Sequence, residues 1–391
     1  MTSEWNHFAL GEITELVIDY RGKTPKKLGG DWCKQGYRAL SAKNIKTGRI
    51  VQAETIRYID ESLYRKWMKD EVQRGDILIT SEAPFGQIFF WDSDEKIVLS
   101  QRLFCVRIKP EYDARFIYYY MTTPEFQSEL DGRATGTTVI GLRQPELMKC
   151  VIRCPEIQEQ KVIAAILSSI DAKIIANEKV NDNLADLLQT IYQERFVNDI
   201  LAVNQGVLSD ICSYSRDKVA VSELNIRTYF STENMLSGKA GSTEATSLPT
   251  TSQTTACHKG DTLISNIRPY FKKIVYCEDK CGCSTDVLCF TPSQPRYSAY
   301  LFSTLYADKF FAFMVAGSKG TKMPRGDKQQ IMTYPVVLPS EEELAGFNTI
   351  ASPLLEQIYS NRSENKRLSI LRDTLLPKLM SGEIDVSAVQ L

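Results

Sequence analysis

Two long stretches of the chain carry apolar residues at heptad spacing, which predicts two long amphipathic helices. In residues 154–200, apolar side chains recur at intervals of three and four residues, at Ile163, Leu167, Ile170, Ile174, Leu184, Leu188 and Ile191. In residues 339–391 the corresponding positions are Phe347, Ala351, Leu354, Ile358, Leu368, Arg372 and Leu375. Such a seam is typical of a coiled coil. Ser340 with Glu343 predicts a capping box at the start of the second helix, and Pro353 predicts a kink or restart inside it.

Both seams are interrupted by asparagine at the same two heptad positions. The asparagines are Asn177 and Asn181 in the first stretch and Asn361 and Asn365 in the second. If the helices pair antiparallel, Asn177 faces Asn365 and Asn181 faces Asn361, and buried amide pairs of this kind fix the register of a coiled coil. The alternative is that each helix packs separately on its own globular unit, but separate packing gives no reason for matched polar breaks.

The stretches that precede the helices predict mixed α+β units. In the first, strands are expected at 75–80 and 87–91 and a helix at 114–130. In the second, strands are expected at 261–265 and 273–276 and a helix at 299–315. The stretch 237–255, rich in Ser, Thr, Gly and Ala, predicts an exposed insertion.

The chain also repeats itself over a long interval. Gly75-Asp76-Ile77-Leu78-Ile79 returns 185 residues later as Gly260-Asp261-Thr262-Leu263-Ile264, and Pro155 returns as Pro339 after 184. We therefore expect a duplicated domain with a pseudo-two-fold relation between its copies. The expected organisation is a first unit at 1–153, a helix at 154–200, a second unit at 201–338, and a second helix with a C-terminal tail at 339–391.

Charge is distributed unevenly although the net charge of the 391 residues is −1. Residues 1–153 carry 23 basic against 21 acidic side chains and residues 202–338 carry 15 against 11, whereas 154–201 carry 4 against 8 and 339–391 carry 5 against 8. Contact with nucleic acid is therefore expected through the globular units. No apolar run is long enough for a membrane helix and no secretory signal opens the chain, so a cytoplasmic protein with reduced thiols and no membrane contact is expected.

No motif for catalysis, cofactor binding or metal binding stands out. There is no phosphate-binding Gly-x-x-x-x-Gly-Lys-Ser/Thr loop, no Gly-x-Gly-x-x-Gly after a strand, and no Asn-Pro-Pro-aromatic segment. The one metal-like group is Cys257, His258, Cys277, Cys281, Cys283 and Cys289, whose spacing fits no common zinc site. We expect no enzyme, no cofactor and no metal.

Several segments in this duplicated order resemble the specificity subunit of type I restriction–modification systems. They are Leu10-Gly11-Glu12-Ile13, Gly22-Lys23-Thr24-Pro25, Tyr37-Arg38-Ala39-Leu40 with Asn44-Ile45, the segment at Gly75-Asp76, Pro155-Glu156-Ile157-Gln158-Glu159-Gln160 and the stretch from Leu375 to Ile384. The resemblance implies two tandem α/β target-recognition domains, joined by an antiparallel two-helix coiled coil, that each read one half of a split sequence in double-stranded DNA. It also implies that the coil sets the spacer and docks two methyltransferase subunits, through which motor–nuclease subunits join. The second unit lacks Gly-Lys-Thr-Pro, so an asymmetric target is expected.

Residues in the polar loops of both units are candidates for DNA contact, because Arg and Lys bind phosphates and guanine, Asn reads adenine, and Ser and Thr hold phosphates. In the first unit they are Arg21, Lys23, Thr24, Lys43, Asn44, Ser81, Arg102, Arg133, Thr135, Thr137 and Arg143. In the second they are Arg216, Lys218, Ser265, Asn266, Arg268, Lys272, Lys319, Thr321, Lys322 and Arg325. Two other readings remain open, a coiled-coil adaptor that binds protein and a stand-alone nuclease or methyltransferase.

Overall fold

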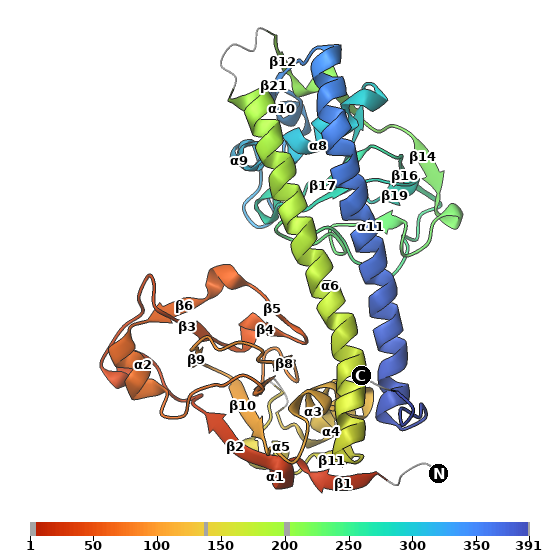
Figure 1. The fold of residues 1–391 in the computed structure, drawn as a ribbon. Coiled ribbons are helices and arrows are strands. Elements are labelled where there is room, and N and C mark those ends of the chain that lie inside the picture. Colours follow the sequence, from red (N-terminus) through yellow and green to blue (C-terminus); the bar gives the residue numbers. More distant parts are fainter. Residues whose placement is uncertain (1–4, 137–139, 199–203, 390–391) are drawn as a thin grey trace. The chain divides into compact units, whose positions relative to one another are not determined.

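The computed structural model describes residues 5–136, 140–198 and 204–389, which form two compact units. Unit 1 comprises residues 1–174 and 367–391, and unit 2 comprises residues 175–366. Both contain helices and sheets, so the predicted α+β class is confirmed (Figure 1). Among the described residues, no helix has the length and apolar character that crossing a membrane requires.

Unit 1 is built on an antiparallel sheet of order β2-β10-β7-β8. These strands are β2 (Thr14–Asp19), β10 (Leu103–Ile108), β7 (Ile77–Thr80) and β8 (Ile88–Phe90). A second sheet of order β6-β3-β9 comprises β6 (Arg57–Ile59), β3 (Tyr37–Leu40) and β9 (Val98–Leu99). Two small sheets pair β1 (Asn6–Ala9) with β11 (Val151–Cys154), and β4 (Ile45–Lys46) with β5 (Arg49–Ile50).

Unit 2 repeats the first of these sheets in the order β13-β20-β17-β18. Its strands are β13 (Cys212–Tyr214), β20 (Val287–Pro292), β17 (Thr262–Ser265) and β18 (Ile274–Tyr276). The pair β12 (Gln205–Val207) and β21 (Pro335–Val337) repeats β1 and β11. The other sheet differs, with order β14-β16-β19-β15 and strands β14 (Lys218–Ala220), β16 (Gln253–Cys257), β19 (Cys281–Cys283) and β15 (Tyr229–Phe230). The repeat is therefore strict in one sheet and loose in the other.

The short helices also correspond between the units, except that α2 has no counterpart among the described helices of unit 2. Unit 1 has α1 (Leu10–Ile13), α2 (Glu61–Trp67), α3 (Ala114–Met121), α4 (Pro124–Arg133) and α5 (Gln144–Leu147). Unit 2 has α7 (Leu208–Ile211), α8 (Ser298–Tyr306), α9 (Asp308–Ala316) and α10 (Lys328–Met332). Short 3-10 turns lie between these elements.

Three expectations about local structure are corrected. The single helices expected at 114–130 and 299–315 are each two, since Thr123 caps a new helix that has Pro124 at its start, and Ala307 takes an extended conformation. The stretch 237–255 is not wholly an exposed insertion, because β16 begins at Gln253 and Ala245 is buried. The second long helix continues through Pro353, so the predicted restart is wrong, while the alternative of a kink stays a prediction.

The repeated Gly-Asp segments have a common structural cause. Gly75 and Gly260 have φ values of +96° and +91°, a region that L side chains rarely adopt, so glycine is required at the turn into β7 and β17. The following aspartates are buried and accept a hydrogen bond from a cysteine thiol, Cys105 to Asp76 at 3.4 Å and Cys289 to Asp261 at 3.2 Å. Each buried carboxylate thereby links the turn to the neighbouring strand of its own sheet, β10 in unit 1 and β20 in unit 2.

The long helices α6 (Ile157–Tyr192) and α11 (Glu341–Met380) contribute side chains to the cores of both units. In unit 1 the core includes Ile163 and Leu167 of α6 with Leu379 of α11. In unit 2 it includes Leu188 of α6 with Phe347 of α11. The capping box is present, because Ser340 N donates to Glu343 Oε2 at 2.7 Å and Glu343 N donates to Ser340 Oγ at 3.2 Å.

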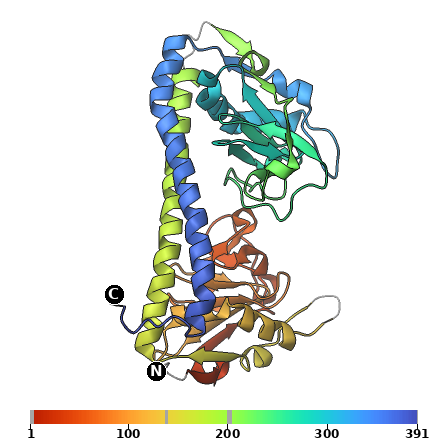
Figure 2. The same cartoon turned by 90° about the vertical axis from the view of Figure 1, so that its right-hand side faces the viewer.

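The two helices run side by side and antiparallel within each unit (Figures 1 and 2). In unit 2, Asn177 Nδ2 donates to Asn365 Oδ1 at 2.8 Å and Asn361 Nδ2 donates to Asn181 Oδ1 at 2.9 Å. These are the contacts that the heptad register predicted. Asn177, Asn181 and Asn361 are at most 8% exposed, so the amides satisfy one another away from water.

In unit 1 an ion pair explains why the charged residue Arg372 stands at a heptad position that is usually apolar. Its Nη1 contacts Asp171 Oδ1 of α6 at 2.8 Å, and Tyr119 Oη of α3 donates to Asp171 Oδ2 at 2.7 Å. One carboxylate thus joins both long helices to a short helix of the unit.

The Asn181–Asn361 pair is expected to contribute specificity more than stability. Asn181→Leu alone leaves the buried Asn361 amide without its partner and should lower the free energy of unfolding by about 1–3 kcal/mol. Asn181→Leu with Asn361→Leu should recover most of this loss, because two apolar side chains replace both partners. Urea denaturation followed by circular dichroism at 222 nm measures both. Additive losses in the double variant would contradict the pairing.

Candidate nucleic-acid interface

Three segments meet at the end of β7 in unit 1 and form what we call loop platform 1, which comprises residues 81–82, residues 101–102, and the described residues 135–136 and 140–142 of the third segment. Ser81 N donates to Arg102 O at 2.9 Å, and Leu142 N donates to Ser81 O at 3.0 Å. In the third segment, Thr135 and Gly141 exchange two backbone hydrogen bonds of 2.9 Å. Residues 137–139, and with them the candidate Thr137, lie outside the described residues.

Unit 2 builds the same arrangement, loop platform 2, from residues 266–267, 285–286 and 319–326. Asn266 N donates to Asp286 O at 2.8 Å, and Gly326 N donates to Asn266 O at 3.2 Å. Lys319 and Arg325 exchange two backbone hydrogen bonds of 2.9 Å. Each bond has a counterpart in unit 1 at the repeat interval, so the backbone of the platform is duplicated.

The side chains of the two platforms differ. In platform 1, Arg102 Nε contacts Glu82 Oε1 at 3.0 Å, and in platform 2, Arg325 Nη2 contacts Asp286 Oδ1 at 3.1 Å. Asp286 occupies the position of Arg102, so the positions of the cation and the carboxylate change between the copies. The same backbone therefore presents different donors and acceptors.

Four candidate cations are held by partners within their own unit. Arg21 makes a two-point contact with Asp19 at 2.8 Å, and Lys23 Nζ donates to Trp67 O at 2.5 Å while burial lowers its pKa. Arg133 contacts Glu129 at 2.9 Å, and Lys272 contacts Asp308 at 3.0 Å. These side chains position loops, and a nucleic acid would have to displace their partners to reach them.

Four other candidates have buried side chains. They are Asn44, Ser81, Ser265 and Asn266, all between 0% and 6% exposed. Asn44 accepts from Ser41 Oγ at 2.9 Å and donates to Thr55 Oγ1 at 3.0 Å, so its amide supports its loop from inside. Direct contact of these four side chains with DNA is not supported.

The remaining candidates are more accessible. Lys43, Arg143, Arg216, Lys218 and Lys322 are exposed and form no ion pair with another described residue. Thr135 and Thr321 are exposed and Thr24 is half-buried. Lys319 is 81% exposed although it contacts Asp327. Arg268 is half-buried and has a φ of +50° beside platform 2. Free donors thus remain in both units.

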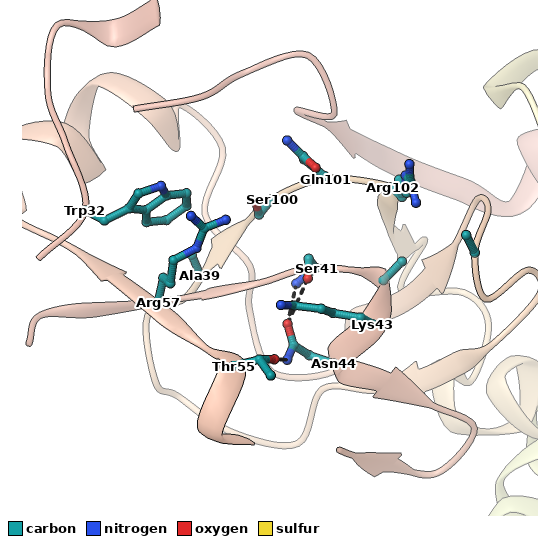
Figure 3. A pocket seen from close by; sticks show the side chains of 12 residues that line it. Trp32, Ala39, Ser41, Lys43, Asn44, Thr55, Arg57, Ser100, Gln101 and Arg102 are labelled. Carbon is teal, nitrogen blue, oxygen red and sulfur yellow. Dashed lines mark hydrogen bonds between the residues drawn. The ribbon is translucent and has the colours of Figure 1, made fainter. Parts of the chain in front are cut away.

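A pocket of about 190 Å³ beside platform 1 brings together residues from five segments (Figure 3). Lys43, Gln101 and Arg102 line it together with Trp32 and Arg57. The Arg57 guanidinium lies 4.1 Å from the centre of the Trp32 ring, a cation–π contact that leaves a flat, basic surface. Sequence analysis missed Trp32, Arg57 and Gln101, since only the fold gathers them. The one feature of the sequence that could have indicated this site was a tryptophan, Trp32, within a polar, glycine-rich segment.

Five of the six cysteines of unit 2 gather in one core. Cys257, Cys277, Cys281, Cys283 and Cys289 are buried with Leu263 and Val275. No group of His, Cys, Asp or Glu in the described ranges has a geometry suited to a metal ion.

Comparison with known proteins finds relatives of one kind. Residues 2–185 match the family model of the type I restriction modification DNA specificity domain. The chain is 28% identical over 187 residues to the type I restriction enzyme MjaVIII specificity subunit of Methanocaldococcus jannaschii, covering 46% of this chain and 43% of that protein. It is 22% identical over 373 residues to the MjaIX specificity subunit of the same organism, covering 80% and 78%.

A solved structure shares the fold across nearly the whole chain. The S subunit of the type I restriction–modification system from M. genitalium superposes with a TM-score of 0.55 at 18% identity, covering 96% of both chains. The match to MjaVIII spans less than half of that relative. Similarity over most of the chain is therefore shown in sequence by MjaIX and in fold by the M. genitalium subunit.

If platform 2 and the pocket beside platform 1 contact phosphates, their unpaired lysines should contribute to the salt dependence of DNA binding. Lys43→Ala and Lys322→Ala should each weaken binding to a duplex and lower the slope of log K against log salt by about 0.9 per lost contact. Fluorescence anisotropy across a salt series measures this slope. Lys66→Ala, an exposed lysine on α2, is the matched control and should leave it unchanged. Equal slopes for all three variants would count against the platforms.

Proposed function

Because residues 2–185 match the type I restriction modification DNA specificity domain and the curated relatives are type I specificity subunits, we propose that the chain is the DNA-recognition subunit of such a system. It would read double-stranded DNA and leave methyl transfer and cleavage to other subunits. No catalytic residue, cofactor or metal is assigned to it. A cytoplasmic location accompanies this role.

The observation that carries the proposal is the duplicated loop platform. Each unit closes the end of its repeated sheet with the same backbone hydrogen bonds, which gives two rigid supports for polar side chains. Loops held by a rigid sheet can present side chains to the edges of base pairs in a groove. Each unit is accordingly proposed to read one half of a two-part target.

Differences between the platforms support an asymmetric target. The Arg102–Glu82 pair of unit 1 is replaced by Arg325–Asp286 in unit 2, and the loop residues Thr135 and Gly141 correspond to Lys319 and Arg325. Since a bidentate arginine favours guanine and other groups favour other bases, unlike platforms imply unlike half-sequences.

The long helices are proposed to set the spacer between the halves and to dock the partner subunits. Asn177 with Asn365 and Asn181 with Asn361 would keep the helices in one register. Both helices also expose apolar side chains by 38–61%, namely Ile175, Val180, Leu187, Ile350, Tyr359, Ile370 and Leu371. Exposed apolar groups on charged helices are typical of protein contacts. Two methyltransferase subunits are the proposed occupants, and motor–nuclease subunits would join through them.

Methylation mapping of the host genome tests this proposal directly. Deleting the gene should abolish methylation at one motif that has two unlike halves separated by unspecified bases, and the wild-type gene should restore it. Complementation with Lys66→Ala serves as the control and should also restore it. An unchanged methylome, or loss of one uninterrupted palindrome, would contradict the proposal. An unchanged methylome would also favour a protein-binding adaptor.

A further inference from the structure

Unit 1 holds an arginine side chain in a small site next to its repeated sheet. Arg115 of α3 places Nη2 2.7 Å from Asp92 Oδ2, and its guanidinium lies 4.2 Å from the centre of the Phe90 ring. Arg74 contacts the other oxygen of Asp92 at 2.5 Å. The carboxylate and the aromatic ring thus enclose a guanidinium that the chain itself supplies.

The corresponding residues of unit 2 follow from matched hydrogen bonds. Gly75 N donates to Trp91 O, and Gly260 N donates to Cys277 O, both at 2.8 Å. Glu278 therefore stands at the position of Asp92. In the same register Tyr276 stands at the position of Phe90, since Ile77 pairs with Phe90 as Thr262 pairs with Tyr276.

The position of Arg115 is occupied by alanine in unit 2. The rings of Phe90 and Tyr118 lie 5.7 Å apart, and those of Tyr276 and Phe302 lie 5.4 Å apart, which aligns α3 with α8. Arg115 then corresponds to Ala299. Unit 2 thus keeps the acid and the aromatic ring but lacks the arginine that fills the site in unit 1.

A pocket of about 360 Å³ lies at this place in unit 2. Tyr276, Glu278 and Ala299 line it. Glu278 Oε1 is buried and accepts no hydrogen bond from any described residue, and burial raises the pKa of this carboxyl. Lys259, which stands at the position of Arg74, also lines the pocket but forms no ion pair with Glu278 in the described chain. An unsatisfied buried carboxylate is costly and calls for a donor.

Helix α11 adds further acceptors to the same pocket. Asn348 and Glu356 line it, whereas the positions 184 residues earlier on α6 are Ala164 and Ala172. Asn348 donates through Nδ2 to Arg296 O at 2.8 Å, while its Oδ1 is buried without a donor in the described structure. Compared with unit 1, unit 2 thus lacks a cation on α8 and has two additional acceptor residues on α11.

We propose that this pocket binds the guanidinium group of an arginine side chain supplied by a partner protein. Glu278, Glu356 and Asn348 provide oxygen acceptors, and Tyr276 provides the ring surface over which a planar cation can lie. Arg115 in unit 1 shows the bound geometry with the chain's own side chain. The pocket is separate from the loop platforms and does not depend on DNA reading. Only the identity of the partner rests on the proposed assembly.

The binding chemistry is tested with n-butylguanidinium as the probe and the full-length chain in isothermal titration. The chain should bind one equivalent, more tightly than it binds n-butylammonium, because an ammonium lacks the planar fork of donors. Glu278→Gln should weaken binding at least about tenfold. Ala299→Arg supplies the missing side chain from within and should abolish binding while the circular dichroism spectrum stays unchanged. No binding by the wild type, or equal binding by Glu278→Gln, would overturn the site.

The source of the guanidinium is tested by comparing the isolated chain with the complex that it forms with its partner subunits. If a partner arginine occupies the pocket, the probe should bind the chain alone and not the assembled complex. Probe binding that persists at full stoichiometry in the complex would overturn the partner assignment and point to a free small molecule. A chain that assembles with no partner would overturn it as well. Methylation mapping remains a separate test of DNA recognition.

Discussion

The buried amide pairs between the long helices are the constraint on which the rest of the structure depends. Each helix supplies side chains to both cores, with Ile163 and Leu188 of α6 in different units. A shift of register would withdraw apolar side chains from both cores and would break the hydrogen bond between the amides of Asn181 and Asn361. A seam of apolar residues alone tolerates shifts by whole heptads, whereas two amide pairs do not. The apolar positions of the seam thus provide stability, and the asparagine positions specify its register.

The duplicated units show how one backbone can support different chemistry. The turn into the repeated sheet keeps its glycine, aspartate and cysteine in both copies, because burial and a positive φ leave little freedom there. Around that frame the charged groups change. Arg107 contacts Asp76 at 2.8 Å in unit 1, whereas Asp261 of unit 2 lies near His258 and Cys289, and burial raises the pKa of Asp261. A carboxylate with a raised pKa favours the folded state at low pH and loses this contribution as the pH rises through that pKa.

Periodicity predicted the large-scale organisation because it reports burial over many residues. The heptads, the asparagine pairing and the duplicated order could all be predicted from the sequence, and the relatives that match are of the predicted family. The ends of short helices could not be predicted from periodicity, since the break at Thr123 depends on one capping side chain and one proline. The contribution of each long helix to both cores was also hidden, because heptad spacing does not name the partner surface.

Individual contact residues were the least predictable part. Residue type marks Asn44 and Arg21 as DNA-binding candidates, but burial and the carboxylate of Asp19 assign them to the support of loops. The opposite error concerns Trp32, Arg57 and Gln101, which lie far apart in the sequence and meet only in the folded unit. Polarity identifies where a loop is, while accessibility and competing partners decide which of its side chains remain free.

The central claim is that the helix pair sets the distance between two independent DNA readers, and lengthening both helices tests it most directly. Three heptads inserted after Leu184 and three inserted before Ile358 would extend the pair by about 31 Å at 1.5 Å per residue. This is about nine base pairs and close to one turn of DNA, so both readers keep facing the same side of the duplex. Methylation mapping should then find the same two half-sequences with a spacer about nine or ten base pairs longer. Methylation retained at the original spacing would contradict the account.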